Sequence, residues 1–329
     1  MFSNLCFSLS ISWYDNKRNF IKMDGNMTKN IVVLGSLNVD NIMKMPRMPL
    51  VGETMALTDV TTAPGGKGAN QAVAASRQGA NVSFIGAVGN DANGQFMRAT
   101  LLTNGVNVDA VSTNSDVPTG SAYIMLQDSG ANTILIHGGA NQALTIEDIN
   151  TALIAQADVL IAQFEVPFEV ILAAFKIAKQ NNVQTILNPA PAVYELTPEL
   201  MAVTDIVLPN ETEAQVLTGI SVINDEGVLN RVSDALQAKG VQRSIITLGE
   251  AGSFIADGQK RWWVQPEKVD AQDTTAAGDT FIGTLASVIA PDFSNLDDAV
   301  QRANIASAIA VTRPGAIPSI PTDKEVDNY

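Results

Sequence analysis

The sequence has almost none of the residues that build disulfides, histidine metal sites or membrane spans. Its 329 residues include one cysteine, Cys6, and one histidine, His137. One cysteine excludes an internal disulfide or a cysteine-based metal cluster, and one histidine makes neither a metal site nor a proton relay. No uninterrupted apolar run approaches the roughly 20 residues that a membrane helix needs. We therefore expect a cytoplasmic protein without a membrane partner.

Positive charge is also scarce. Lys and Arg number 20 against 34 Asp and Glu, which gives a net charge of −14. Such a surface repels nucleic acid and anionic lipids, so we expect neither as a partner. The chain is 46% hydrophobic and 16% charged, which is typical of a globular protein with a solvated acidic surface.

Two common nucleotide-binding signatures are missing. The glycine-rich segment Ala63-Pro-Gly-Gly-Lys-Gly-Ala-Asn70 is not a Walker loop, because Thr61 replaces the leading glycine and no Ser or Thr follows Lys67. No strand–helix junction carries a dinucleotide fingerprint, which argues against a nicotinamide-dependent dehydrogenase. The three glycines of this segment nevertheless let backbone amides approach a ligand, and Lys67 and Asn70 add polar tips.

Short apolar segments alternate with helical patterns along the chain. The apolar segments predict strands at 31–34, 82–85, 159–162, 184–187, 205–208 and 244–248. The spacing predicts helices over 68–79, 93–104, 146–156, 168–181, 211–218 and 226–239. This alternation predicts an α/β fold, a three-layer doubly wound and mostly parallel sheet with helices on both faces.

Two segments break that rhythm. Residues 39–62 and 119–137 read as extended and half-exposed, with a hairpin turn at 128–132. We expect them to form a small β-sheet lid over one edge of the main sheet. Residues 1–26 lack the pattern of a targeting peptide, and we expect a non-native or disordered extension before a single domain over 27–329.

Polar residues follow the first predicted strand. Asn38 and Asp40 are two apart, so on an extended segment their side chains point the same way. An amide and a carboxylate side by side suit the vicinal hydroxyls of a sugar. The alternative is a turn in which both side chains bond to nearby backbone.

A second polar pair, Asn210 and Glu213, stands at a predicted helix start. Both could face a hydrated Mg²⁺, which prefers oxygen ligands and keeps its waters. The pair also matches a capping box, in which the two residues satisfy each other's backbone amides. Both interpretations can hold at once.

The stretch Thr274-Thr-Ala-Ala-Gly-Asp-Thr-Phe281 opens a predicted helix near Ala276. Free amides at a helix start bind anions, and Ala276–Gly278 carry no side chain that covers them. Asp279 could accept the proton of a hydroxyl group that attacks phosphorus. As a stability device alone it would contribute only about 0.3–1 kcal/mol.

These motifs resemble the signatures of the ribokinase-like sugar kinases. The three that carry the resemblance, in this order, are 65–71, 210–213 and 273–281. The resemblance covers residues 29–321, and the segments 35–40 and 310–319 are similar to those of members that act on ribose. It implies a ribokinase-like fold with a β lid and transfer of phosphate from MgATP to the 5-hydroxyl of D-ribose. Pairing of two lids into a homodimer is also implied.

The resemblance implies a role for each matching residue, with Asp279 as the general base and Gly278 donating to the transferred phosphate. The sugar site would comprise Asn38, Asp40, Gly66, Lys67, Gly68, Ala69, Asn70, Glu165 and Asp279. The ATP site would comprise Asn210, Thr247, Leu248, Gly249, Glu250, Ala251, Gly252, Gly278 and Asn304. A K⁺ site would comprise Asp273, Thr275, Ala310, Arg313, Gly315 and Ser319, and Glu213 would reach Mg²⁺ through water.

Two alternatives stay open. One is a related kinase for fructose, deoxyribose or a nucleoside such as adenosine. The other is a sugar-sensing protein without catalysis, although the intact pair Gly278–Asp279 argues against it. We expect Trp262 and Trp263 to pack at the sheet edge near the nucleotide, with adenine stacking as an alternative.

Overall fold

The computed structural model describes residues 28–329, so the expectation for residues 1–26 lies outside the described part. Ten strands form one sheet in the order β14-β13-β12-β11-β10-β9-β1-β4-β5, with β6 also paired to β4. They are β1 (Asn30–Leu34), β4 (Asn81–Gly89), β5 (Val106–Asn107), β6 (Val111–Asn114), β9 (Val159–Gln163), β10 (Gln184–Asn188), β11 (Ile206–Val207), β12 (Arg243–Thr247), β13 (Ser253–Asp257) and β14 (Lys260–Val264). All pairings are parallel except β12–β13 and β13–β14.

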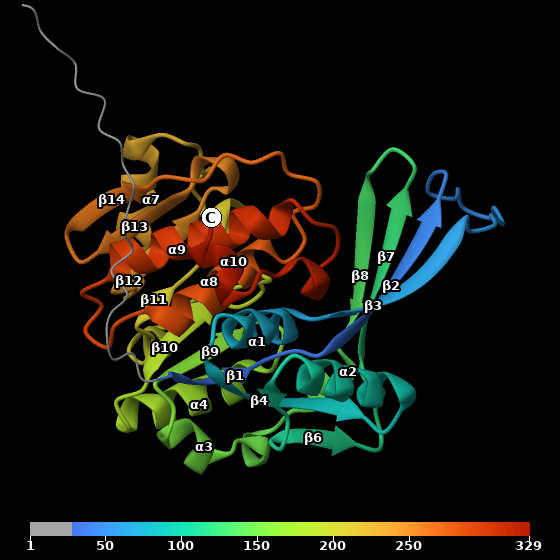
Figure 1. The fold of residues 1–329 in the computed structure, drawn as a ribbon, viewed down its shortest axis with the longest axis horizontal. Coiled ribbons are helices and arrows are strands. Elements are labelled where there is room, and N and C mark those ends of the chain that lie inside the picture. Colours follow the sequence, from blue (N-terminus) through green and yellow to red (C-terminus); the bar gives the residue numbers. More distant parts are fainter. Residues whose placement is uncertain (1–27) are drawn as a thin grey trace, which may run out of the picture.

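Helices cover both faces of this sheet (Figure 1). One face carries α1 (Lys67–Arg77), α2 (Ala92–Thr103), α8 (Ala277–Val288) and α9 (Leu296–Val311). The other carries α3 (Thr151–Ala155), α4 (Phe168–Gln180), α5 (Pro198–Met201), α6 (Glu211–Thr218) and α7 (Glu226–Ala238). A last helix, α10 (Asp323–Asp327), packs on α9 through Val326. The predicted three-layer α/β fold is confirmed.

The sheet supplies two separate cores because its strands are apolar on both faces. Every residue of β9 and β10 is buried. Val159 and Ile161 point into the core below α1 and α8, whereas Leu160 and Ala162 point into the core below α4 and α7. This alternation is how a central parallel strand contributes to two helix layers at once.

The prediction of one continuous helix over 146–156 was wrong. It is split into a 3₁₀ turn, η2 (Ile146–Asp148), and the short helix α3. Thr145 and Asp148 form a capping box at the first turn, and the Asn150 side chain accepts from Leu153 N at 3.0 Å. Asn150 thereby starts a new helix instead of continuing the old one. The other 3₁₀ turns are η1 (Gly139–Ala143), η3 (Gly249–Ala251) and η4 (Ile317–Ser319).

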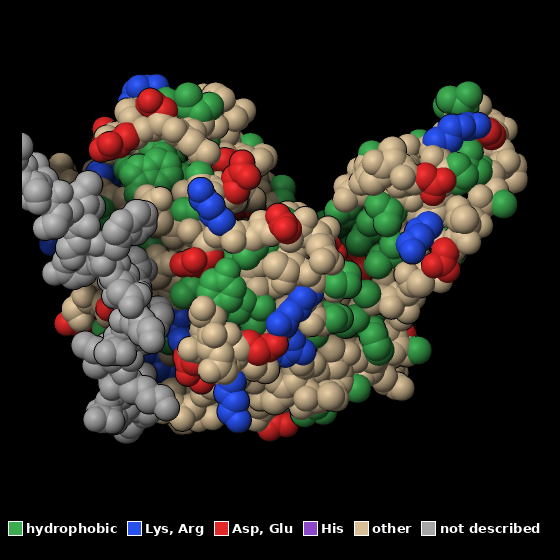
Figure 2. Space-filling model, turned by 45° about the horizontal axis from the view of Figure 1, so that its top comes forward, with side chains coloured by type: hydrophobic (Ala, Val, Ile, Leu, Met, Phe, Trp, Pro, Cys, Tyr) green, Lys and Arg blue, Asp and Glu red, His purple; other side chains and the backbone are tan. Residues whose placement is uncertain are grey.

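The two irregular segments form a separate four-stranded sheet, as expected for a lid. Its order is β3-β2-β7-β8, with bounds β2 (Asn38–Met45), β3 (Asp59–Gly65), β7 (Gly120–Gln127) and β8 (Asn132–His137). Strands β2 and β7 are parallel, and the outer pairs are antiparallel. Figure 2 shows this lid standing across an open cleft from the body. His137 ends β8, where every residue is exposed.

The order of the strands fixes where a ligand site belongs. From β1 the chain adds β4 and β5 on one side and β9 to β12 on the other, so the direction of growth reverses between β1 and β9. In open α/β sheets, ligands bind at such a reversal, outside the carboxyl ends of the strands. Among the described helices, none combines the length and the apolar character required to cross a membrane.

Candidate active site

The loops that follow β1 and β9 are joined at the reversal of strand order. The hydroxyl of Ser36 donates to Glu165 Oε2, and the backbone amide of Lys67 donates to the same oxygen at 3.2 Å. Burial raises the pKa of Glu165, and the opposing effects of Lys67 and these two hydrogen bonds are smaller. The loops after two strands and the start of α1 therefore meet at one carboxylate.

Gly66 permits this meeting. It precedes α1 with φ 94°, a conformation that favours glycine. A Cβ there would lie 2.8 Å from the carbonyl oxygen of Ser36 and 2.9 Å from the amide of Asn38. The neighbouring Gly68 and Ala69 are buried in the first turn of α1 against the loop after β1. Any side chain at position 66 would push α1 away from that loop.

Asn38 and Asp40 lie in β2, at the base of the lid. A residue without an earlier assigned role, Asn141, holds Asn38: its Nδ2 donates to Asn38 Oδ1 at 2.8 Å, and its Oδ1 accepts from Leu37 N at 2.9 Å. The amino group of Asn38 is thereby turned away from Asn141. Burial raises the pKa of Asp40 to about 7, and the nearby charge of Glu165 adds to that rise.

Asp279 lies in the first turn of α8 and is only 8% exposed. Its two carboxylate oxygens accept from two amides of α1, Asn70 Nδ2 and Gln71 Nε2, each at 2.9 Å. Because one donor holds each oxygen, the carboxylate has a defined orientation. Gln71 belongs to the motif 65–71, but sequence reasoning gave it no role.

The start of α8 is strained and open. Ala276 precedes the helix in the left-handed conformation, with φ 59°, and no side chain caps it. Ala277 N donates to Thr274 O, whereas no backbone acceptor for the amide of Gly278 occurs among residues 28–329. A Cβ placed on Gly278 would have no atom within 4 Å. The helix therefore presents a free amide to open space, as an anion site requires.

A cavity of about 210 Å³ opens at this helix start. Its wall comprises Lys67, Asn188, Leu208, Asn210, Glu213, Thr247, Thr274, Ala276, Ala277, Gly278, Asp279 and Ile282. Burial disfavours the charged lysine, but the negative charges of Asp279, Glu165 and Glu213 outweigh it and raise the pKa of Lys67. Lys67 therefore stays cationic between the carboxylates. Asn188 is a polar residue of the cavity wall to which sequence reasoning gave no role.

Asn210 and Glu213 form the capping box at the start of α6. Glu213 accepts from Asn210 N at 2.9 Å, and Asn210 Oδ1 accepts from Glu213 N at 2.8 Å. Burial raises the pKa of Glu213. No group of three His, Cys, Asp or Glu side chains able to hold a metal occurs in the described part of the chain. The carboxylate of Glu213 therefore fits a metal that arrives with a nucleotide and keeps its water ligands. It does not fit a metal that is coordinated entirely by protein side chains.

The residues expected to hold ATP follow β12. Thr247, Asn210 and Gly278 reach the cavity wall, whereas Leu248 is buried. Positions 249–251 form η3, and Gly252 follows with φ 87°. Asn304 is buried, accepting from Ser253 Oγ at 2.9 Å. The structure thus places 247–252 and Asn304 along one end of β12 and β13.

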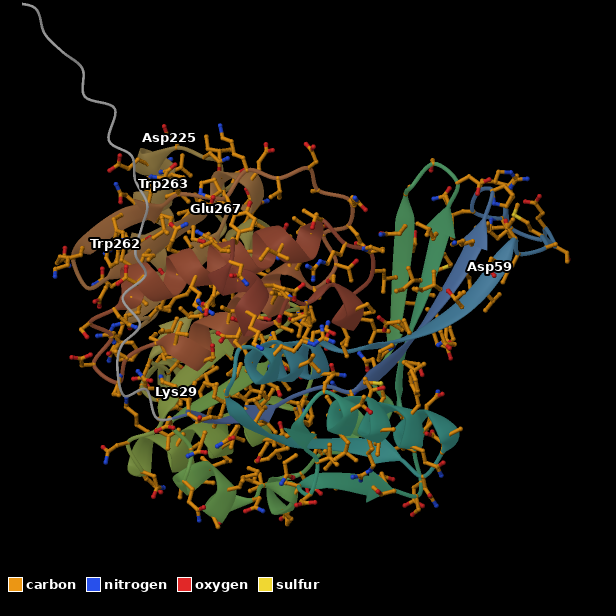
Figure 3. The ribbon with its side chains drawn as sticks, viewed as in Figure 1. Lys29, Asp59, Asp225, Trp262, Trp263 and Glu267 are labelled. Carbon is orange, nitrogen blue, oxygen red and sulfur yellow. The ribbon has the colours of Figure 1, made fainter. Side chains whose placement is uncertain are left out.

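The two tryptophans lie on the edge strand β14, at the opposite end of the molecule from Asp59 of the lid (Figure 3). Trp262 donates to Asp297 Oδ1 at 3.1 Å. Trp263 packs edge-on against Phe254, with centroids 5.4 Å apart. These contacts place both side chains against the sheet edge, and neither contributes to the wall of the 210 Å³ cavity, so a role near the nucleotide stays a prediction.

Four of the six residues expected around K⁺ lie in two loops that Asp273 joins: Asp273 and Thr275 in one, Arg313 and Gly315 in the other. The carboxylate of Asp273 accepts from Thr275 N at 2.9 Å and from Gly315 N at 2.8 Å. Arg313 instead pairs its side chain with Glu325 at 2.7 Å. Ala310 and Ser319 are buried beside these loops, and Ser319 Oγ donates to Ala316 O. The segment that precedes α8 and the segment that follows α9 therefore lie side by side.

The comparisons with known proteins agree with the fold described above. The chain is 40% identical to a ribokinase of Staphylococcus aureus over 92% of this chain and 99% of that protein. It is 45% identical to a bifunctional ribokinase/ribose-5-phosphate isomerase A of Fructilactobacillus sanfranciscensis, of which it spans 56%. The structure of an Arabidopsis thaliana ribokinase complexed with ribose and ATP matches with a TM-score of 0.84, at 31% identity, over 92% of this chain and 98% of that one. Residues 28–323 match the pfkB family of carbohydrate kinases, and the chain belongs to that family.

Proposed function

We propose that this protein transfers the γ-phosphoryl group of ATP to the 5-hydroxyl of D-ribose. One observation carries the proposal: the carboxylate of Asp279 and the free amide of Gly278 occupy successive positions at a helix start that opens into a cavity. A proton acceptor beside an anion-binding amide is what attack of a hydroxyl on a phosphoryl group requires. The family membership, and relatives that are ribokinases over most of the chain, support ribose as the acceptor.

The chain's own residues divide the work. Asn38 and Asp40 hold sugar hydroxyls at the base of the lid, and Glu165, Lys67 and the glycines before α1 complete the pocket. Asp279 accepts the proton of the attacking hydroxyl. The amide of Gly278 and the cationic Lys67 stabilise the charge that develops on the phosphoryl oxygens. The lid closes over the sugar and excludes water, which prevents wasteful hydrolysis of ATP.

A divalent metal such as Mg²⁺ accompanies ATP in this class of kinase. Glu213 and Asn210 would hold its water shell from the cavity wall, and the metal would supply charge neutralisation on the phosphates. A monovalent cation would sit near Asp273, Thr275 and Gly315, with Ala310, Arg313 and Ser319 completing its site. Such an ion would fix the loops before α8, so exchange of K⁺ for a large organic cation should slow turnover.

We also place the protein in the cytoplasm, as a homodimer through the lid. Among residues 28–329, strand β8 has no further strand paired to its outer edge, and Ile134, Leu135 and Ile136 on it are 51–58% exposed. An exposed apolar edge of this kind favours pairing with a second strand. Sedimentation of the wild type and of Ile136→Glu tests the dimer: a wild-type monomer, or a variant that still dimerises, would contradict this arrangement.

An ATP-consumption screen tests the reaction. Ribose, deoxyribose, fructose and adenosine are offered at equal concentrations with MgATP and K⁺, and formation of ADP and of the sugar phosphate is measured. We expect ribose to give the highest kcat/KM. A preference for another acceptor would reassign the substrate within the family. If no acceptor led to ADP and a sugar phosphate, a sensing protein would be favoured.

A further inference from the structure

Three buried amide side chains with no role in the mechanism above meet beside Asp279. Gln71 projects from α1, Gln163 ends β9, and Asn188 ends β10. Gln163 and Asn188 are register partners in the parallel sheet, so their side chains leave adjacent strands at the same level. Gln71 and Gln163 are fully buried, and Asn188 is 6% exposed.

In the amide cluster formed by Gln71, Gln163 and Asn188, the groups at its two ends can only accept hydrogen bonds. They therefore fix which atom donates in each hydrogen bond of the cluster. A carboxylate only accepts, so Gln71 Nε2 donates to Asp279 Oδ1 at 2.9 Å. The Leu208 carbonyl only accepts, so Asn188 Nδ2 donates to it at 3.1 Å and Asn188 Oδ1 faces Gln71 Nε2 at 3.2 Å. Both N–H groups of Gln71 are then used. Its Oε1 accepts from Gln163 Nε2 at 2.7 Å.

The backbone makes room for the amide cluster at two glycines. A Cβ on Gly35 would collide with Gln163 Oε1, and a Cβ on Gly283 would lie 2.5 Å from the carbonyl oxygen of Gln71. Gly283 thereby lets α8 approach α1 at the level of Gln71. Gln163 Oε1 is buried and has no hydrogen-bond partner within residues 28–329. Apolar side chains would avoid that desolvation cost, which indicates that the amides serve more than stability.

We propose that Gln71, held by Gln163 and Asn188, is a positioning residue that fixes the carboxylate of Asp279 toward the cavity. The inference rests on the proposed function, because it needs Asp279 to take a proton. Asn70 holds the second carboxylate oxygen, so two neutral donors define the orientation, and no salt bridge to Asp279 occurs among residues 28–329. The charged side chains whose fields reach Asp279 are Lys67, Glu165 and Glu213, and they stay unchanged in the variants below.

The test is the pH dependence of kcat at saturating ribose and MgATP, where the acid limb reports protonation of the base. Gln71→Met keeps the length of the side chain and removes the donor. It should lower kcat at pH 8 about tenfold and move the acid limb up by about one pH unit, because a donor to the charged form is lost. Gln71→Glu should move that limb further, since two carboxylates would then share the site. The KM for ribose should change by less than about twofold, because sugar contacts are kept.

Two further variants separate positioning from packing. Gln163→Met should shift the acid limb in the same direction but less, with an unfolding midpoint equal to or above that of the wild type. Gln78→Met is the matched control, because Gln78 is a buried glutamine just after the same helix that bonds to Pro321 O and Arg302 instead. It should leave the pH profile unchanged even if it lowers the unfolding midpoint.

The outcomes are distinguishable. If the wild type phosphorylates ribose and both Gln71 variants keep its acid limb, the positioning role is overturned while the proposed function stands. If the wild type phosphorylates no sugar, both fall. Should Gln71→Met fail to fold, Gln71→Glu and Gln163→Met still decide the question, because an unshifted limb in both overturns the proposal.

Discussion

The two ends of the proposed sugar site hold their carboxylates in opposite ways. At the helix end, Asp279 accepts one amide hydrogen bond on each oxygen. At the lid end, no side-chain or backbone donor to the carboxylate of Asp40 occurs in the described part of the chain, and burial raises its pKa to about 7. Both residues are largely enclosed, so the difference lies in the donors around them and not in burial alone.

This difference indicates that one carboxylate is fully hydrogen-bonded before a ligand binds, whereas the other gains its donors only from the ligand. The helix end is complete before any ligand arrives, because its donors fix the acid that must face the attacking oxygen. The lid end is incomplete, because Asp40 lacks the hydrogen bonds that would offset its burial. In the proposed function, sugar hydroxyls would be the missing donors, and their arrival should stabilise the ionised form of Asp40. In the proposed function, reaction and recognition are thereby prepared at opposite ends of the sugar site.

The largest effect should come from removing the acid at the helix end. In Asp279→Asn, kcat should fall about 10²–10⁴-fold, because the general base is lost. Binding of ribose and ATP should stay within a few-fold of the wild type, since the amide keeps the shape of the carboxylate. Rapid-quench turnover and calorimetry measure the two separately. Near-normal turnover would show that another group takes the proton.

A smaller effect is expected at the lid end, where the acid recognises the sugar. The ionised Asp40 accepts from hydroxyls, so ribose affinity should fall about tenfold per pH unit as the pH drops below 7, and level off above it. Calorimetry in two buffers of different ionisation enthalpy should show release of a proton on binding. In Asp40→Asn this pH dependence should vanish, and an unchanged slope in that variant would assign the titration to another group.

For the same variant, Asp40→Asn, we also predict how the free energy of unfolding changes with pH. The raised pKa means that the ligand-free fold binds a proton that the unfolded chain has already lost between pH 3.8 and about 7. This contribution to stability is complete below pH 3.8 and is lost as the pH rises through 7. Asp40→Asn should therefore have a higher free energy of unfolding than the wild type at pH 8, by on the order of 2–4 kcal/mol. At pH 4 its free energy of unfolding should be no higher than that of the wild type. Thermal unfolding without sugar measures both.

Much of the fold could be predicted from the sequence, because its strands are apolar on both faces and its helices carry caps. The helix predicted over 211–218 has those bounds in the structure, since Asn210 and Glu213 mark its start. The split of 146–156 was missed because Asn150 reads as an ordinary helix residue until its side chain is seen to cap α3. Periodicity shows where a helix is possible, whereas a cap inside the pattern decides where it starts.

The site was less predictable than the fold. Asn38, Lys67 and Asp279 follow strand ends or begin helices, where function is expected. Gln71, Asn188 and Asn141 were missed, because their partners are 208, 117 and 103 residues away in sequence. A buried amide looks the same in sequence whether it caps a turn or holds a carboxylate. The signal that remained was local: Gln71 follows Lys67 and Asn70 in the polar first turns of α1, just before the small apolar run Ala72–Ala75.

The smallest expected effect concerns the strained residue before α8. Ala276 has φ 59°, which costs an alanine about 1–2 kcal/mol relative to a right-handed conformation. Ala276→Gly removes that strain but adds about 0.4–1 kcal/mol of unfolded-state entropy, so the net gain in unfolding free energy should be at most about 1 kcal/mol. Because the loop becomes freer to move, kcat should fall about two- to threefold while ribose affinity at the lid end is unchanged. Denaturant unfolding and steady-state kinetics measure both, and a change in ribose affinity of the same size as the change in kcat would mean that the two ends are not independent.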